Sequence, residues 1–404
     1  MTEIQSILKA CTDAEAKSPP LALATVVYVE GSVYRRPGAR MLVLADGHHI
    51  GGISGGCLEA DVVHRALGVM VSGEPEYVLY DAHTSNGDII VELGCKGAVG
   101  ILIEPACASP ARDCLNFVAS FKANRGVGAM ATVYQAEGIG QAKQGDRLFY
   151  RQCGQTAGNS PALPGDSGWD TNLTECIRAD MEQCLDTGRA ISQCYGFEGG
   201  IAEVLIEPVH SPISLIICGA GQDAPPIAHI AQLMGWDVTV TDNRSSMLEP
   251  TRFPEAALCA HPQANPMVGL DMLDARTAVV IMTHNYAQDL AWLEHVLPST
   301  AGYVGLLGPR RRSEELLLEL KLPDLTVEER ARAQARLHSP IGLDIGSETP
   351  EEIALAIISE ILAVMNRASG GSLRNRSGAI HGGVYEFVPQ HRQIKQVSKC
   401  PALV

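Results

Sequence analysis

The second half of the chain alternates short apolar runs with amphipathic stretches. The apolar runs have the length and β-branched content of buried strands, and the stretches between them repeat apolar residues at helical spacing. The predicted strands are residues 213–218, 237–241, 277–282 and 303–307. The predicted helices are residues 224–234, 287–296 and 311–320. This alternation predicts a doubly wound parallel sheet, which is a Rossmann-like α/β fold.

A final helix and a tail complete the predicted second half. Thr349 stands as N-cap, Pro350 as the first helical residue and Glu352 three residues after the cap, so a helix should begin here and run to about Asn366. Residues 367–404 are polar and glycine-rich, with scattered basic side chains. Such a composition favours a largely irregular tail.

The first half of the chain contains an internal repeat. The run ATVVYVEG near the N-terminus aligns with a later run, ATVYQAEG, and Gly38 and Arg40 recur as Gly145 and Arg147 at the same offset. Each copy ends in an apolar run followed by Glu-Pro. We therefore predict two α+β lobes related by duplication, ahead of the Rossmann-like region. The predicted domains are residues 1–125, 126–210 and 211–366, followed by the tail 367–404.

One copy of the repeat carries a glycine-rich segment that the other lacks. It reads GGISGGCLE, in which Ser54, Gly55 and Gly56 lead Cys57 into the predicted first turn of a helix over residues 58–71. Glycine lets backbone N–H groups converge and a ligand approach closely. The positive end of a helix dipole favours a thiolate. The segment is therefore a candidate site for a small anion or a soft metal centre. The alternative is a structural cysteine buried beside a tight turn.

Further candidate residues flank this segment. Arg35, Arg36 and Arg40 surround a predicted Pro-Gly turn between two strands, where three guanidinium groups favour a phosphate-like anion. The alternative is a hairpin that faces solvent. Cys95, in the sequence Leu-Gly-Cys-Lys-Gly, is a second candidate thiol.

The Rossmann-like region carries the pattern of a dinucleotide site. Gly219 and Gly221 follow the first predicted strand and open a helix, and Asp242 ends the next strand. In this context the glycines admit a phosphate to the helix N-terminus, and the carboxylate can bind a ribose diol. Pro225 and Pro226, however, remove N–H donors from the first helical turn. The alternative is that the crevice binds another phosphorylated ligand.

Polar residues also follow the other predicted strands. His284 lies directly after one strand in Thr-His-Asn, and Gly308 and Arg310 belong to a Gly-Pro-Arg-Arg-Arg run after another. Ligands of such sheets bind outside the carboxyl ends of the strands. These residues therefore extend the candidate binding site, with a solvated helix start as the alternative for the arginine run.

Composition narrows the functional classes. The formal charge of −15 over 404 residues argues against nucleic-acid and anionic-membrane partners. The sequence contains no apolar run of 18 residues, so no membrane span is predicted. The amphipathic N-terminus is unlike a signal peptide, and 12 cysteines without a C-x-x-C pair indicate reduced thiols in a cytoplasmic protein. The sequence lacks Ser/His/Asp, zinc-protease and Walker motifs, so its residues suit holding a cofactor better than turning over a substrate.

Taken together, these segments resemble the XdhC/CoxI family of accessory factors, which mature molybdenum hydroxylases such as xanthine dehydrogenase. The resemblance covers residues 20–366 and rests on many short segments in the same order. They are residues 24–27, 31–32, 36–38, 54–59, 104–105, 219–221, 242–244, 252–254, 283–285, 303–308 and 340–346.

This resemblance implies a function and a site. Members of the family bind the molybdenum–pterin cofactor, protect it, and deliver it to an apo molybdenum hydroxylase after a cysteine desulfurase has supplied the terminal sulfur. Cys57 carries over as the contact to the cofactor and as the candidate molybdenum ligand, and Arg244 lies in a family motif of the sheet domain. The chain departs from the family where Val33 and Tyr34 replace its usual Pro-Arg, and where Lys96 replaces a glycine.

Two functional hypotheses of different classes follow. The first is a non-catalytic accessory protein that binds the molybdenum cofactor. The alternative is an NAD(P)-dependent oxidoreductase that uses the crevice formed by residues 219–242, against which the Pro225-Pro226 pair and the lack of a clear proton donor count. A homodimer is expected from the base rate for soluble proteins.

Overall fold

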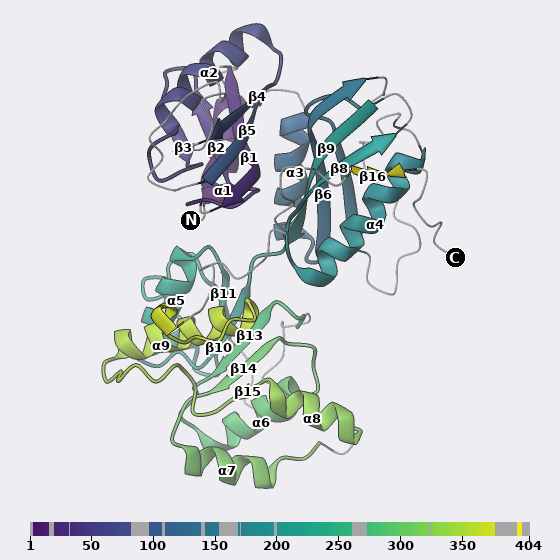
Figure 1. Cartoon of the computed structure of the whole chain (residues 1–404). Coiled ribbons are helices and arrows are strands. Elements are labelled where there is room, and N and C mark those ends of the chain that lie inside the picture. The colour runs from purple at the N-terminus through teal and green to yellow at the C-terminus, as the bar shows by residue number, and fades with distance from the viewer. Residues whose placement is uncertain are drawn as a thin grey trace. The chain divides into compact units, whose positions relative to one another are not determined.

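The computed structural model describes the chain as two compact units (Figure 1). One contains Glu3–Ser211 together with a short C-terminal segment, and the other contains Pro212–Asn375. No helix among the described residues is long and apolar enough to cross a membrane. The described residues are 3–15, 20–31, 33–81, 97–106, 110–138, 142–152, 169, 171–197, 200–260, 273–322, 325–375 and 394–397.

The first lobe of the N-terminal unit is an antiparallel sheet with the strand order β3-β2-β1-β5-β4. Helix α2 packs on one face of this sheet and helix α1 on the other. The helix predicted over residues 58–71 is confirmed as α2 to within one residue at each end. The elements of this lobe are α1 (Glu3–Glu15), β1 (Leu21–Gly31), β2 (Arg40–Leu44), β3 (His49–Gly51), α2 (Glu59–Ser72), β4 (Glu76–Asp81) and β5 (Gly97–Pro105).

The second lobe has the strand order β16-β8-β9-β6-β7. Its elements are α3 (Pro110–Ala123), β6 (Val127–Gly138), β7 (Arg147–Gln152), α4 (Thr171–Thr187), β8 (Ile191–Phe197), β9 (Gly200–His210) and β16 (Ile394–Gln396). The order β7-β6-β9-β8 corresponds strand for strand to β2-β1-β5-β4 of the first lobe. Both long strands also shift register at equivalent positions, Val26/Tyr28 and Val133/Gln135. These matches support the predicted repeat, and the duplication itself stays a prediction.

Strand β1 is apolar along most of its length because both of its faces are covered. Ala22 and Ala24 face α2, whereas Leu23 packs with α1 and α3. Val27 meets the second lobe in a cluster that contains Tyr134. A strand that is buried on both faces is apolar on both, so apolar and polar residues do not alternate along it. The run ATVVYV therefore follows from the central position of β1 in the unit.

The second unit is a parallel sheet with the strand order β12-β11-β10-β13-β14-β15. This is the order of a doubly wound dinucleotide-binding fold, so the predicted Rossmann-like fold is confirmed. Helices α5 and α9 cover one face, and α6, α7 and α8 cover the other (Figure 1). Its elements are β10 (Ser214–Cys218), α5 (Ala224–Leu233), β11 (Asp237–Asp242), the 3₁₀ turn η1 (Ser245–Met247), β12 (Ala257–Ala260), β13 (Thr277–Ile281), α6 (Tyr286–Val296), β14 (Tyr303–Leu306), α7 (Arg310–Glu319), α8 (Val327–Ala335), β15 (Leu337–His338), α9 (Pro350–Met365) and η2 (Leu373–Asn375).

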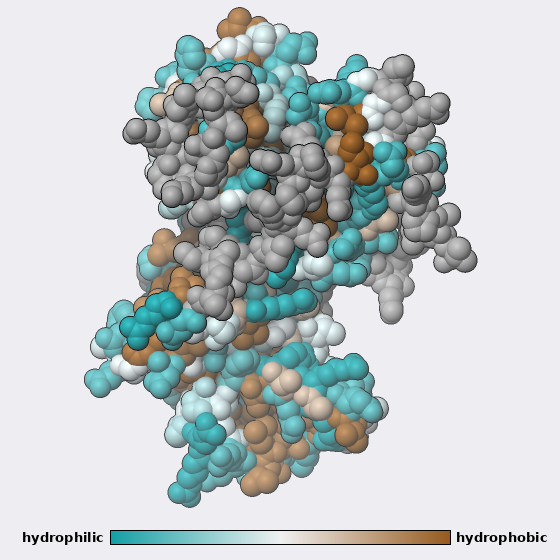
Figure 2. All heavy atoms as spheres, viewed as in Figure 1, coloured by the Kyte–Doolittle hydropathy of each residue, from teal (hydrophilic) through white to brown (hydrophobic). Residues whose placement is uncertain are grey.

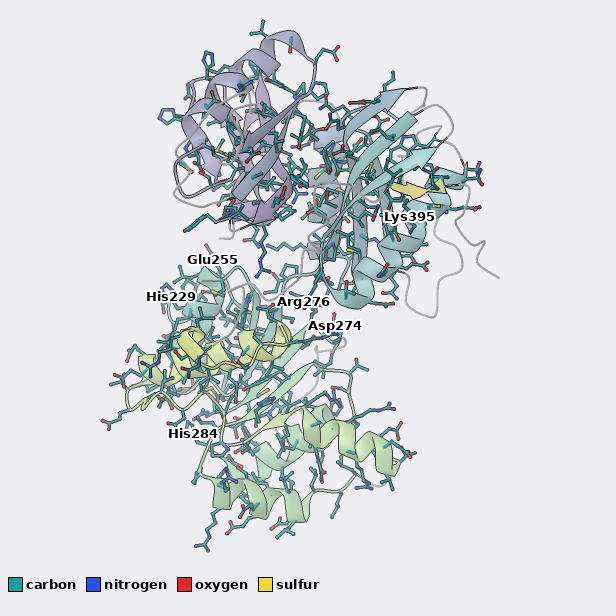
Figure 3. The ribbon with its side chains drawn as sticks, viewed as in Figure 1. His229, Glu255, Asp274, Arg276, His284 and Lys395 are labelled. Carbon is teal, nitrogen blue, oxygen red and sulfur yellow. The ribbon has the colours of Figure 1, made fainter. Side chains whose placement is uncertain are left out.

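Several short elements differ from the sequence prediction. Strands β12 and β15 and helix α8 were not predicted, because segments of two to nine residues leave little periodic pattern. The tail predicted to be irregular contains β16, which pairs in parallel with β8. Lys395 of β16 binds both carboxylate oxygens of Asp180, at 2.6 and 2.8 Å (Figure 3). The predicted cap of α9 is confirmed as a capping box between Thr349 and Glu352.

Apolar side chains also reach the surface of the Rossmann unit. Leu233 of α5, Leu355 of α9 and Leu318 of α7 are exposed. Figure 2 shows apolar residues on this surface beside polar ones. Exposed apolar side chains of this kind are normal for globular proteins, so we assign no partner to them.

Candidate functional site

The glycine-rich segment forms a loop between β3 and α2, residues 51–59, which we call the Cys57 loop. Its shape is set by Glu59, whose carboxylate folds back and accepts the N–H groups of Ser54 at 2.8 Å and Ile53 at 3.2 Å, together with the Ser54 hydroxyl. Ser54 Oγ in turn accepts the N–H groups of Gly56 and Leu58 at 3.1 and 3.2 Å. Partial burial acts to raise the pKa of Glu59, but these hydrogen bonds lower it below its usual value.

Cys57 lies at the surface of this loop, just ahead of α2. Its thiol is exposed and lies 3.5 Å from Ser54 Oγ. Cys11, Cys114 and Cys218, in contrast, are buried. The alternative of a buried structural cysteine is therefore wrong for Cys57, and its thiol is accessible to a ligand.

A narrow crevice opens beside this thiol, and we call it the Cys57 crevice. The ring of Tyr34 covers Gly55, since a Cβ at Gly55 would lie 3.6 Å from the ring. Gly56 has a φ of +110° and open space above it. The N–H groups of Gly55 and Cys57 have no acceptor in the part of the chain that the structure describes. The crevice is lined by Tyr34, Arg35, Ile53, Ser54, Gly55, Cys57, Leu58 and Val99.

Helix α1 holds the other end of the Cys57 loop. Glu3 binds Arg35 through both carboxylate oxygens, at 2.7 and 2.6 Å, and its Oε1 accepts the N–H of Gly52 at 3.1 Å. Gly51 must be glycine, because a Cβ there would lie 2.5 Å from the carbonyl oxygen of Arg40. Sequence reasoning missed Glu3, since a single acidic residue at the start of a helix gives no signal of a contact so far along the chain.

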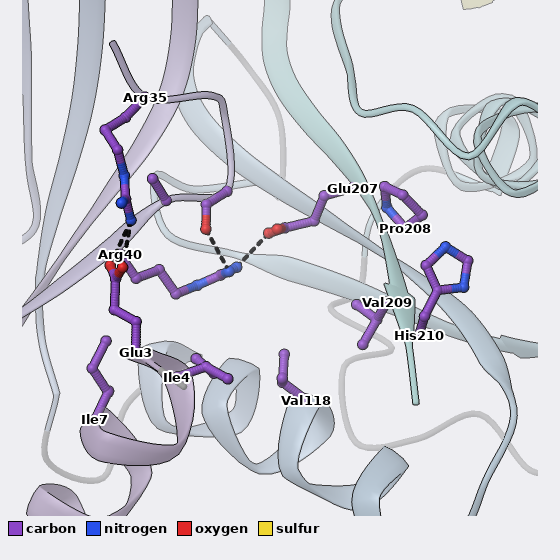
Figure 4. A pocket seen from close by; sticks show the side chains of 12 residues that line it. Glu3, Ile4, Ile7, Arg35, Arg40, Val118, Glu207, Pro208, Val209 and His210 are labelled. Carbon is purple, nitrogen blue, oxygen red and sulfur yellow. Dashed lines mark hydrogen bonds and ion pairs between the residues drawn. The ribbon is translucent and has the colours of Figure 1, made fainter. Parts of the chain in front are cut away.

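The predicted anion-binding arginines of this lobe differ in exposure and in their partners. Arg36 is exposed and remains available to a ligand. Arg40 instead forms a buried ion pair with Glu207 of β9 and donates to the carbonyl oxygen of Gly38 (Figure 4). Burial acts to lower the pKa of Arg40, but the neighbouring Cys114 thiol and the Glu207 carboxylate raise it above its usual value.

Arg40 is therefore an internal contact between the lobes, which corrects the prediction of three arginines around one surface anion. The internal repeat could have indicated this role, because Arg40 has a counterpart in the second lobe. Its counterpart Arg147 forms the reciprocal ion pair with Glu104, at 2.9 and 2.5 Å. Cys95, the second predicted thiol, lies outside the described residues.

The glycine turn of the Rossmann unit follows β10. Gly219 has a φ of +118°, and a Cβ there would lie 2.4 Å from the carbonyl oxygen of Met282, so the position requires glycine. The N–H of Ala220 donates to Asp242 at 2.8 Å. Arg244 donates to the same carboxylate through its backbone N–H and two guanidinium nitrogens, at 2.8 to 2.9 Å.

Asp242 is thus already satisfied by the protein. Burial raises the pKa of this carboxyl, but the hydrogen bonds from Arg244 and Ala220 lower it below its usual value. A ribose diol would have to displace the Arg244 guanidinium to bind Asp242. Pro225 and Pro226 lie in the first turn of α5, where neither offers an N–H donor. These contacts count against a dinucleotide held in the usual way.

Other predicted residues gather at the same edge of the sheet. His284, which is labelled in Figure 3, follows β13. Its ring lies over Gly221, 3.6 Å from where a Cβ would stand, and its Nε2 is 3.7 Å from Asp223. Its φ of +58° is unusual for a non-glycine residue. Gly308 also has a positive φ, and Arg310, the first residue of α7, is exposed.

Two arginines near these predicted residues bind the loops at the carboxyl ends of the strands. Arg312 binds the buried Asp289 at 2.6 Å. Arg252 donates to the carbonyl oxygen of Gly221 at 3.0 Å. Sequence reasoning gave Arg252 no role, although it stands in one of the short segments on which the resemblance rests.

Both units match known proteins. Residues 14–81 match the model of the XdhC and CoxI family, and residues 215–361 match that of the XdhC Rossmann domain. A probable xanthine dehydrogenase subunit from Bacillus subtilis (strain 168) is 30% identical over 359 residues, which are 86% of this chain and 94% of that protein.

A second relative and a solved structure are similar over most of their length. The molybdenum cofactor insertion chaperone PaoD of Escherichia coli (strain K12) is 24% identical over 361 residues, 89% of this chain and 88% of that protein. A crystal structure of a xanthine dehydrogenase from Bacillus halodurans has a TM-score of 0.65 and 26% sequence identity, and covers 92% of this chain and 98% of its own.

Proposed function

Because the chain belongs to the XdhC and CoxI family, we propose that it binds the molybdenum–pterin cofactor and assists its insertion into a molybdenum hydroxylase of the xanthine dehydrogenase type. Two relatives that align over most of their length support a role in maturation, since one is named for xanthine dehydrogenase and the other for cofactor insertion. Sulfuration by a cysteine desulfurase, a cytoplasmic location and a homodimer remain predictions.

The observation that carries the proposal is the exposed Cys57 thiol in a preorganised glycine loop. Ser54 and Glu59 hold the loop in one conformation, so the thiol is presented without further ordering. Gly55 and Gly56 carry no side chain that would keep a large ligand away. Tyr34 forms one side of the crevice.

The donors of this loop fit the chemistry of the cofactor. A thiolate is a soft ligand for a metal–sulfur centre, and the N–H groups of Gly55 and Cys57 can donate to anionic oxygen. The exposed Arg36 guanidinium can bind a phosphate. When bound, the cofactor supplies the redox-active metal centre that a hydroxylase needs.

In the Rossmann unit, considered by itself, we propose that Arg244, His284 and Arg310 form a site for a phosphorylated ligand. These side chains lie at or beyond the carboxyl ends of β11, β13 and β14, where ligands of this fold bind. The pairing of Asp242 with Arg244 and the two prolines of α5 count against the alternative of an NAD(P)-dependent oxidoreductase.

Equilibrium titration of the full-length protein with molybdopterin tests the proposal. We expect saturable binding that Cys57→Ser weakens at least about tenfold, equivalent to about 1.4 kcal/mol. Cys259→Ser is the matched control, because Cys259 is a partly exposed cysteine in the other unit. Wild-type affinity in Cys57→Ser would remove the role given to this thiol. Saturable NAD binding without molybdopterin binding would favour the oxidoreductase.

A further inference from the structure

A cavity of about 300 Å³ lies where the two lobes of the N-terminal unit meet, and we call it the interlobe cavity (Figure 4). Its walls come from α1, the turn before β2, helix α3 and strand β9. Most of its surface is apolar, with Ile4, Ile7, Val118 and Val209 among the lining residues. Five ionisable side chains also line it: Glu3, Arg35, Arg40, Glu207 and His210. A cavity of this size with both apolar and polar walls can admit a small molecule.

The most deeply buried polar groups of the interlobe cavity form one ion pair. Arg40 donates from Nη2 to Glu207 and from Nη1 to the carbonyl oxygen of Gly38 at 2.8 Å. Its buried Nε has no hydrogen-bond partner among the described residues. The two side chains are 9% and 10% exposed. A guanidinium and a carboxylate therefore stand side by side against apolar walls.

The repeat offers an internal comparison for this pair. Arg147 and Glu104 form the equivalent contact, with side chains 2% and 4% exposed, and neither lines the interlobe cavity. Arg147 also has a buried Nε without a hydrogen-bond partner among the described residues, so this atom alone does not indicate a ligand. What distinguishes Arg40 and Glu207 is that they face the cavity.

This combination of groups selects a class of ligand. The amide edge of a flat heterocycle presents N–H donors beside a carbonyl acceptor, and an adjacent carboxylate and guanidinium complement both. We propose that the interlobe cavity binds the pterin ring of the molybdenum cofactor, with Glu207 and Arg40 recognising its amide edge. This assignment rests on the proposed function and gives the organic part of the cofactor a site of its own.

The interlobe cavity and the Cys57 crevice share one residue. Arg35 lines both, and its partner Glu3 lines the cavity and accepts the N–H of Gly52 in the Cys57 loop. A ligand in the cavity therefore contacts the ion pair that anchors this loop. The two hollows are therefore joined by the Glu3–Arg35 ion pair.

Fluorescence titration of the full-length protein with metal-free 6-hydroxymethylpterin tests the assignment. We expect saturable quenching that Val118→Trp, which fills the cavity, weakens at least about tenfold. Ile4→Phe fills the cavity from α1 and provides a second variant if the first does not fold. Val63→Trp is the matched control, because Val63 is a partly buried valine on α2 outside the cavity.

A second pair of variants tests the polar recognition. Glu207→Gln should weaken pterin binding about tenfold, whereas Glu104→Gln, the equivalent change away from the cavity, should preserve it. Absence of saturable pterin binding by the wild type, or wild-type affinity in both cavity-filling variants, would overturn the assignment. If those variants also retain molybdopterin, the cavity is excluded while the proposed function stands. If the wild type binds free pterin but no molybdopterin, the proposed function fails instead.

Discussion

The reciprocal ion pairs between the lobes allow a quantitative test of how the N-terminal unit is held together. Arg147 binds both oxygens of Glu104 at 2.9 and 2.5 Å, and the two side chains are almost completely buried. The variant Arg147→Met keeps the apolar stem but leaves the Glu104 carboxylate buried without its partner. We expect the free energy of unfolding to fall by about 3–5 kcal/mol, because an uncompensated buried charge costs this much.

A double variant separates the charge effect from packing. Arg147→Met combined with Glu104→Leu removes both charges and keeps similar volume. The attraction within a buried ion pair roughly equals the cost of removing both charges from water. We therefore expect the free energy of unfolding of the double variant to lie within about 1 kcal/mol of the wild-type value, or to exceed it.

Native-state hydrogen exchange measures these free energies locally. Opening free energies of β5 and β7, which carry the two residues, should fall in the single variant and recover in the double variant. Strands β10 and β13 of the Rossmann unit serve as the internal control and should be unchanged. A single variant within about 1 kcal/mol of the wild type would refute the reasoning, as would a double variant no more stable than the single one.

Three further predictions follow from single contacts. The pKa of Glu59 is lower in the folded protein than its ordinary value of 4.5, so its stabilisation of the Cys57 loop is complete above pH 4.5 and is lost as the pH falls through the folded pKa. The protection of this loop against hydrogen exchange should fall over the same pH range. Glu59→Gln should make this protection independent of pH. Lys395→Ala should release β16 from β8, seen as faster exchange in both strands and faster proteolysis of the tail, whereas Lys395→Arg should retain both. Gly219→Ala should lower the free energy of unfolding of the Rossmann unit by about 1–3 kcal/mol, because the added Cβ would clash with backbone at a position of positive φ. Thermal unfolding measures this change, and a variant with the melting temperature of the wild type would contradict the prediction.

The Rossmann strands could be predicted because their signals are local. The strand predicted over residues 213–218 is observed as Ser214–Cys218, and its apolar run follows from burial on both faces of a parallel sheet. Strand β16 could not be predicted in this way. Its three residues become a strand only by pairing with β8, some 200 positions earlier, and by the contact of Lys395 with Asp180.

The candidate site shows the same limit. Residue types predicted that Cys57, Gly55 and Gly56 belong to a candidate ligand-binding loop, but the conformation of this loop depends on Glu59 folding back onto Ser54. Arg40 was assigned to a surface anion because its neighbours in sequence are basic. Its actual partner, Glu207, is 167 residues away in the second lobe.

The sequence by itself determined the Rossmann-like sheet, the repeat pattern of the first half, the family, and the loop that carries the candidate thiol, because each of these is written in local periodicity or in short motifs. Only the tertiary structure decided that Cys57 is exposed, that Asp242 is occupied by Arg244, and that Arg40 and Glu207 meet beside a cavity. The physical reason is that burial and the pairing of charges depend on which distant segments pack together, and this information belongs to no single stretch of the chain.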